Sequence, residues 1–266
     1  MKKILLLLLV FNLAFSVLML EPTKKDVQNG DVVDLGEIGP GQTITLYFHP
    51  EVSTGGVYEE GGRYDFAKVT FITPGWSYEN SKYLGFPLQV KITAAKDASE
   101  GEYYSKVTIE DENYAEKLNN ITITAKVKII HDVMNAEVSP LEKTSRPGEQ
   151  SNFTITIHNK GTTGDVFRVW TEGTERFKYE RNVYVAPKST EMLTYAITER
   201  DEERHNIKIN VESVASNAIH QEQDIRLTVR SDLIGDYKST NNGLILAPVF
   251  EGVIYSIAGF ISNLFR

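Results

Sequence analysis

The chain has 266 residues, no cysteine and a formal net charge of −8 at pH 7. Without cysteine, disulfides, thiol chemistry and cysteine-ligated zinc are excluded. The acidic balance, with both signs of charge intermixed along the chain, argues against nucleic acid as a partner, because phosphate binding requires clustered lysine and arginine.

The N-terminal segment is an apolar run that follows two lysines. A basic start before an apolar stretch is typical of a secretory signal. The sequence therefore predicts a signal peptide over residues 1–20, and the small residues Ala14 and Ser16 favour cleavage after Ser16. Since Val17–Leu20 stay apolar beyond that site, an uncleaved signal anchor remains open as the alternative.

The middle of the chain contains a repeat of alternating strands. The turn at residues 39–42 opens a strand over Ile44–Phe48, and the turn at 146–149 opens a similar strand over Phe153–Ile157. Apolar residues at every second position after a Pro-Gly turn indicate half-buried antiparallel strands. Three more pairs recur at an offset of roughly a hundred residues: Leu88–Thr93 with Met192–Ile197, Ser105–Ile109 with Asn206–Val211, and Ile121–Ile129 with Ile225–Val229.

This repeat predicts an all-β fold of two tandem antiparallel β-sandwiches. We expect the first domain over residues 26–132 and the second over 133–232, followed by a linker over 233–243.

Several motifs in these strands resemble those of a known family. The second half carries Pro147-Gly148, Asn159-Lys-Gly161, Asp165-Val-Phe167, Ala186-Pro187-Lys-Ser189 and a closing strand near Leu227. The first half carries Thr73-Pro-Gly-Trp76 and the hairpin motif Asp97–Tyr103. Over residues 30–230 the chain resembles the Ig-like extracellular domains of archaeal and bacterial surface proteins, of the CARDB-like, NPCBM-associated or S-layer-domain-like type. The resemblance implies a non-catalytic module that spaces, adheres or binds outside the cell.

Two details of this resemblance concern the hairpin. Tyr103 or Tyr104, shortly after Gly101, is expected to act as a corner tyrosine that bonds back to the main chain. In the second half, Asp201–His205 replaces the Gly-Tyr hairpin and so departs from the pattern.

The most aromatic stretch, residues 71–86, contains Trp76, Tyr78 and Tyr83 in a loop rich in proline, glycine, serine and asparagine. Exposed aromatic side chains could stack on a sugar ring or anchor a protein partner, which makes these three the candidate ligand-binding residues. The interpretation that the pattern favours is that Trp76 caps the sandwich core.

No constellation for catalysis or metal binding is evident. The acidic loops Asp111–Asn113 and Asp201–Glu203 lack the glycine and spacing of a calcium loop, so solvated turns are favoured. The five histidines lack metal-ligand spacing, and no nucleophile, phosphate-loop or dinucleotide motif occurs. We therefore expect no enzyme, no metal and no cofactor. Paired carboxylates of a surface hydrolase are the alternative, because their separation is spatial rather than sequential.

Two sequons occur, Asn120-Ile-Thr122 and Asn152-Phe-Thr154. Both asparagines fall on the outward side of their predicted strands, so an exported chain could be glycosylated there. Chance is the alternative, because threonine-rich strands produce such triplets readily.

Residues 244–265 are apolar and predict a transmembrane helix, since ~20 helical residues cross a ~30 Å hydrocarbon core. Glu251 interrupts the stretch, and an amphipathic helix lying in the membrane interface is the alternative. Four small or mildly polar residues recur at helical spacing and would let another helix approach closely: Gly252, Ser256, Gly259 and Asn263.

These features predict a single-pass protein of the cell membrane with extracytoplasmic β domains and, because Arg266 follows the tail helix, a cytoplasmic C-terminus. Its expected role is a structural or interaction module that binds a protein partner or an envelope component, or that self-associates through the tail helix. A carbohydrate-binding module built around Trp76 is the alternative, and a surface hydrolase is the second alternative.

Overall fold

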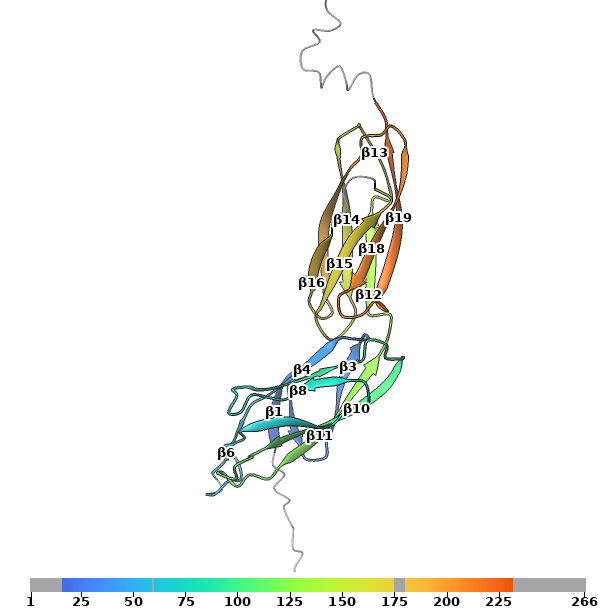
Figure 1. Ribbon diagram of the computed structural model, residues 1–266. Helices are drawn as coiled ribbons and strands as arrows, with labels where there is room; N and C mark the ends of the chain where they lie inside the picture. The colour runs from blue at the N-terminus through green and yellow to red at the C-terminus, as the bar shows by residue number, and fades with distance from the viewer. Residues whose placement is uncertain (1–15, 59, 175–179, 232–266) are drawn as a thin grey trace, which may run out of the picture.

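The computed structural model describes residues 16–58, 60–174 and 180–231. All regular elements within these residues are β-strands, which confirms the all-β prediction. The strands form two groups that lie end to end, and each group encloses its own hydrophobic core (Figure 1).

The first group packs a five-stranded sheet against a four-stranded sheet. The five-stranded sheet contains, in spatial order, β2 (Lys25–Gln28), β1 (Ser16–Glu21), β4 (Thr43–Phe48), β9 (Leu88–Thr93) and β8 (Ser77–Glu79). The four-stranded sheet contains β3 (Val32–Ile38), β11 (Ile121–Ile129), β10 (Gly101–Glu110) and β7 (Phe66–Phe71). The two-residue strands β5 (Glu51–Val52) and β6 (Gly62–Arg63) pair separately.

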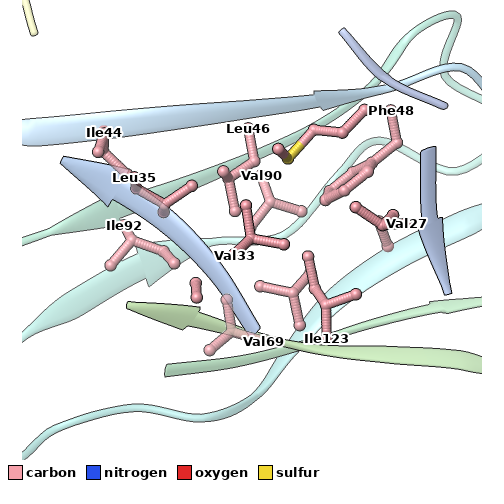
Figure 2. Packing of buried hydrophobic residues seen from close by; sticks show 14 of the residues in the cluster. Val27, Val33, Leu35, Ile44, Leu46, Phe48, Val69, Val90, Ile92 and Ile123 are labelled. Carbon is pink, nitrogen blue, oxygen red and sulfur yellow. The ribbon is translucent and has the colours of Figure 1, made fainter. Parts of the chain in front are cut away.

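Alternation along the strands builds the core of the first group. Ile44, Leu46 and Phe48 of β4 are buried, while the threonines and tyrosine between them lie on the outer face. They meet Val33 and Leu35 of the opposite sheet (Figure 2). Burial of such side chains supplies most of the favourable free energy of folding, at about 25 cal/mol per Å² of apolar surface.

The second group packs a three-stranded sheet against a five-stranded sheet. The three-stranded sheet contains β12 (Met134–Ser139), β14 (Gln150–Asn159) and β17 (Thr190–Thr198). The five-stranded sheet contains β13 (Glu142–Ser145), β19 (His220–Val229), β18 (Arg204–Ser213), β15 (Asp165–Glu172) and β16 (Arg181–Val185).

Both groups repeat one pattern of strand pairing. The β4–β9 pair of the first group corresponds to β14–β17 of the second, and the run β7–β10–β11 corresponds to β15–β18–β19. In each group a short strand, β3 or β13, pairs parallel with the last strand, while the other pairs are antiparallel. Each strand that repeats in the sequence therefore forms in the expected place in both halves.

The N-terminal boundary differs from the prediction. Residues 16–20 were expected to end a signal segment, but they form most of β1, which pairs with both β2 and β4. Val17 and Met19 are fully buried in the first core. The first domain therefore begins ten residues or so before residue 26, and the apolar character of Val17–Leu20 belongs to a strand.

The expected signal at residues 1–15 and the expected tail helix at 244–265 lie outside the described residues. Within the described ranges, the structure contains no helix with the length and apolar character needed to cross a bilayer.

The junction between the two groups includes backbone contacts. The Thr162 N–H donates to the Glu37 carbonyl oxygen at 2.8 Å, and the Thr162 hydroxyl has the Leu35 and Glu37 carbonyl oxygens as acceptors for its one proton, at 3.1 and 3.0 Å. Gly36 permits this approach, since a Cβ at that position would lie 2.5 Å from Thr162 Cγ2.

A buried polar network crosses the same junction. Gln42 is 2% exposed and donates through Nε2 to Asp165 Oδ2 at 2.6 Å, while its Oε1 accepts from the Gly39 N–H at 2.7 Å. Asp165 Oδ2 also accepts from the Ser213 hydroxyl at 2.7 Å. The buried carboxylate is therefore compensated from both domains, as burial of a charge requires.

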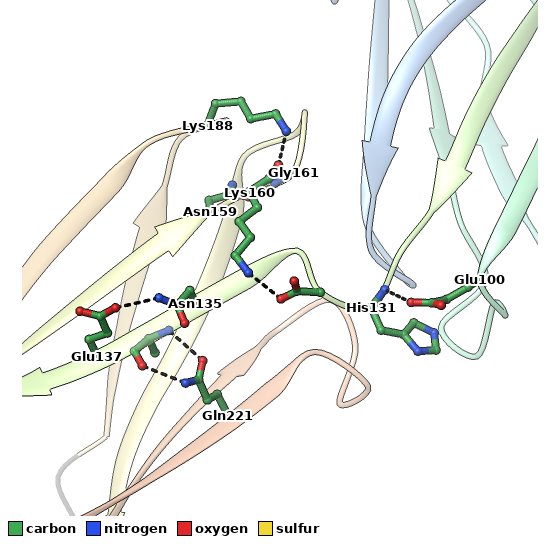
Figure 3. Close-up of polar contacts among 11 residues, drawn as sticks. Glu100, His131, Asn135, Glu137, Asn159, Lys160, Gly161, Lys188 and Gln221 are labelled. Atoms are coloured by element: carbon green, nitrogen blue, oxygen red, sulfur yellow. Dashed lines mark hydrogen bonds and ion pairs between the residues drawn. The ribbon is translucent and has the colours of Figure 1, made fainter.

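The connecting segment is held on both sides (Figure 3). The His131 N–H donates to Glu100 Oε1 at 3.0 Å in the first domain, and Asp132 pairs with Lys160 of the second domain at 2.6 Å. Further along, Gln221 bonds both the N–H and the carbonyl of Ala136, at 2.8 and 2.9 Å. These contacts attach the connecting segment to both domains and continue into the start of the second.

Candidate functional site

The three predicted ligand-binding aromatics do not form one open surface. Trp76 is 8% exposed, and its ring lies 5.2 Å from the ring of Tyr103, centroid to centroid, so it closes the first core. The weaker hypothesis, Trp76 as a stacking platform, is therefore corrected, and the favoured interpretation, Trp76 as a cap on the sandwich core, agrees with the structure. Tyr78 on β8 and Tyr83 in the following loop are 46% and 45% exposed.

Tyr83 links two loops at the end of the first domain that lies away from the junction. Its hydroxyl donates to Asp65 Oδ2 at 3.0 Å, and the Asn113 side-chain amide donates to the same hydroxyl oxygen. The hydrogen bond to Asp65 raises the pKa of Tyr83, because ionising the phenol would remove the proton that this bond uses. Tyr83 is thus a positioned side chain with a ring that remains half exposed.

Two buried carboxylates organise the backbone at this end. Asp65 Oδ1 accepts from the Glu112 N–H at 2.8 Å, and its carbonyl oxygen accepts from the Leu84 N–H at 2.8 Å. Asp111 accepts from the N–H groups of Ala115 and Glu116 at 3.1 and 2.9 Å. Main-chain donors therefore occupy both carboxylates, an arrangement that suits turn formation better than acid–base catalysis.

The nearby phenol of Tyr64 is fully enclosed and donates to the Asn119 carbonyl oxygen at 2.7 Å. Burial, reinforced by the charge of Asp111, raises the pKa of Tyr64 to about 12. Tyr64 therefore serves as a neutral donor that ties the 111–119 loop to the core.

The same loops hold exposed residues on strained backbone. Leu84 and Tyr114 have φ of 55° and 58°, a region that bulky side chains rarely adopt. Leu84 is nevertheless 54% exposed and Tyr114 70% exposed. We call Tyr83, Leu84 and Tyr114 the distal tip. The sequence does not indicate positive φ at Leu84 or Tyr114, because neither position carries the glycine or asparagine that usually adopts it.

Strain of this kind costs about 1–3 kcal/mol per residue and concentrates at binding sites. The distal tip therefore combines apolar and aromatic side chains, a polar framework beneath them and loops held in fixed conformations. Such a surface is suited to contact with a partner, since large exposed aromatic and aliphatic side chains are the usual anchors of interfaces.

A hollow of about 450 Å³ lies beside the junction. Lys96 of the first domain and Arg168, Glu180 and Glu212 of the second line it. Arg168 bonds Glu212 at 2.9 Å and lies 4.6 Å above the ring of Trp170. The charges in this hollow compensate one another, which leaves little excess charge to recognise a ligand.

The other predicted positions are dispersed. Asn120 and Asn152 are both exposed, as their outward assignment predicts, and their glycosylation stays a prediction. Residues 252–263 of the tail face lie outside the described residues. In the ranges that the model describes, no group of three or more histidine, aspartate or glutamate side chains could hold a metal ion.

No family model and no curated protein sequence matches the chain. Solved structures do match, at low identity. A chimeric titin Z1Z2 that carries a KLER peptide from decorin is 13% identical with a TM-score of 0.35, and the match covers 82% of this chain and 99% of the other. The CARDB domain of a Pyrococcus furiosus protein in complex with di-metal ions is 19% identical with a TM-score of 0.29, over 36% of this chain and 87% of that domain.

A further match is a chain from the complex of zinc 2-glycoprotein and prolactin-inducible protein from human seminal plasma. It is 10% identical with a TM-score of 0.31, over 37% of this chain and 95% of the other. The neighbours thus include the CARDB type that the sequence resembles. Similarity at this level carries no information on ligand or activity.

Proposed function

We propose that the protein is a non-catalytic interaction module of the cell surface that presents the distal tip of its first domain to a protein partner or envelope component. The observation that carries the proposal is the exposure of Leu84 and Tyr114 on strained backbone at the end opposite the junction. Exposed apolar side chains that are also costly to hold in place favour a binding role over a purely structural one.

Within this proposal the two domains are Ig-like sandwiches of the CARDB-like type. Three features support the assignment: the repeated pairing of β4 with β9 and of β14 with β17, the parallel strand beside the last strand of each domain, and a corner tyrosine. The corner residue is Tyr103, whose hydroxyl donates to the Ser99 carbonyl oxygen at 2.9 Å.

The membrane placement rests on sequence. An export signal ahead of Ser16 and an apolar tail at 244–265 would hold the second domain near the bilayer and the first domain away from it. Self-association through the small-residue face of the tail, at Gly252, Ser256, Gly259 and Asn263, is a second way for such a protein to assemble.

Site-specific photo-crosslinking in native membranes tests the proposal. A photoreactive amino acid replaces Tyr114 in the full-length chain, and the same amino acid replaces Tyr184 as the control. The two tyrosines are 70% and 61% exposed, but Tyr184 lies on β16 of the second domain. We expect a discrete adduct from position 114 and none from position 184.

A second variant separates recognition from folding. Leu84→Gly removes an exposed apolar side chain and also relieves the positive φ, so the variant should be at least as stable as the wild type. We expect it to lose most of the adduct formed from position 114. An unchanged adduct, or equal adducts from positions 114 and 184, would contradict a partner contact at the distal tip.

A further inference from the structure

A second hollow lies on the outer face of the five-stranded sheet of the first domain, close to the distal tip. It measures about 450 Å³, within the range of small-ligand sites. Its floor comes from β4 and β9 and its wall from the loop between β8 and β9. The lining residues are Tyr47, Glu79, Asn80, Lys82, Gly85, Phe86, Pro87, Gln89 and Lys91.

Phe86 supplies an exposed aromatic ring that is held in one orientation. The ring is 61% exposed, yet it contacts the edge of the His49 ring at 5.3 Å between centroids and lies 5.6 Å from the guanidinium of Arg63. These neighbours restrict the ring, and Arg63 lies over one of its faces, while the rest of the ring stays exposed. A ligand that stacks on Phe86 therefore meets a side chain whose conformational entropy is already reduced.

Polar side chains line the same hollow as this ring. Gln89 Nε2 donates to the Tyr47 hydroxyl at 3.2 Å, which orients both side chains. Asn80 accepts from the Val69 N–H through its side-chain oxygen at 2.9 Å, so its amide N–H groups serve as the donors that remain. The hollow thus offers hydrogen-bonding groups around an apolar ring.

The hollow also differs in charge from the rest of the protein. Its ionisable lining groups are Glu79, Lys82 and Lys91, which sum to +1, whereas the chain as a whole carries −8. Glu79 pairs with Lys91 at 2.8 Å, and this hydrogen bond raises the pKa of Lys91. Lys82 supplies the excess positive charge, and a single carboxylate would complement it.

We propose that this hollow binds a saccharide that carries a carboxylate, of the hexuronic acid class. The apolar C–H face of such a sugar ring would stack on Phe86, its hydroxyls would bond Asn80 and Gln89, and its carboxylate would pair with Lys82. This site goes beyond the partner contact proposed for the distal tip and does not depend on it. It also places saccharide recognition on Phe86 rather than on the buried Trp76.

Calorimetric titration of the full-length protein in nanodiscs tests the proposal. The probes are a short oligogalacturonate and its fully methyl-esterified form, which has the same rings without the carboxylates. We expect binding of the acidic form, weaker binding of the ester, and an affinity for the acidic form that falls as salt increases.

Two variants locate the site. Phe86→Ala should lower the affinity about tenfold or more because the stacking surface is lost. Lys82→Gln should lower the affinity for the acid about fivefold and leave that for the ester unchanged. Phe71→Ala is the matched control, since Phe71 is 52% exposed on β7 of the other sheet. This variant should bind the acidic saccharide with the affinity of the wild type.

Equal affinities for the acid and the ester, no binding of either, or equal binding by the Phe86→Ala variant would each overturn the proposal. Loss of the position-114 adduct in Phe86→Ala without any saccharide binding would assign the hollow to a protein partner instead. The crosslinking result at position 114 is measured separately, so the two proposals can fail independently.

Discussion

At the scale of single residues, the two halves keep one contact with different side chains. The Tyr103 hydroxyl bonds the carbonyl oxygen four residues before it, and His205 Nε2 lies 3.1 Å from the Asp201 carbonyl oxygen, also four residues before it. Tyr103 pairs across the strands with Val127, and His205 pairs with Leu227 in the equivalent place. The second half, which departs from the Gly-Tyr hairpin, therefore has a histidine in place of the tyrosine and keeps the contact with the carbonyl oxygen four residues before.

The corner contact can be measured by substitution. Tyr103→Phe removes only the hydroxyl and should lower the free energy of unfolding of the first domain by about 1 kcal/mol. Tyr104→Phe is the control, because the Tyr104 hydroxyl bonds the exposed Glu102 on its own strand, and its loss should lower the free energy of unfolding by less than about 0.5 kcal/mol. Chemical denaturation followed by fluorescence reports both values, and equal losses would contradict the corner role.

At the scale of elements, β1 is a strand that the alternation of apolar and polar residues does not reveal. Strands β4 and β14 are predictable because one face is polar, so apolar residues fall at every second position. Strand β1 lies between β2 and β4 and has half-buried leucines on its outer side, so its sequence is continuously apolar. A continuous apolar run directly after an export-like segment cannot be separated from it by composition.

Loss of a core side chain from β1 tests this assignment. Met19→Ala should lower the free energy of unfolding by about 2–5 kcal/mol, because Met19 is fully buried in the first core. Leu18→Ala, at a half-buried position of the same strand, should cost less than half as much. If neither substitution changes the denaturation midpoint, residues 16–21 do not belong to the fold.

The candidate sites were less predictable than the strands, for a physical reason. The distal tip depends on Asp65 joining loops that are far apart in the chain, and the orientation of Phe86 depends on His49 and Arg63. Such contacts leave no periodic pattern in the sequence. Trp76 was more predictable, since the interpretation that the sequence favours, a cap on the sandwich core, is the one that the structure shows.

At the scale of the whole molecule, the junction determines how the distal tip is presented. Gly41 lies against the second domain, where an added Cβ would stand 2.3 Å from the Ala215 carbonyl oxygen. Gly41→Ala should therefore push the domains apart and broaden the distribution of inter-domain distances measured by electron spin resonance. Gly30→Ala is the control, because Gly30 also has positive φ but its added Cβ would meet no atom within 4 Å. Equally narrow distributions in both variants would contradict a junction that depends on close packing at Gly41.

We propose that a membrane-held second domain carries the distal tip away from the bilayer. The main strands of each domain, such as β10 and β18, have 10 residues. Two such strands end to end span roughly 65 Å at ~3.3 Å per residue. Because the chain has no cysteine, a single cysteine at position 114 or at position 141 can be labelled uniquely.

Energy transfer from each label to acceptor dyes in the bilayer, measured on the full-length protein in vesicles, tests this claim most directly. We expect strong transfer from position 141, which lies beside Arg226 of β19 in the second domain, and almost none from position 114. Equal transfer from both positions, or stronger transfer from position 114, would contradict it.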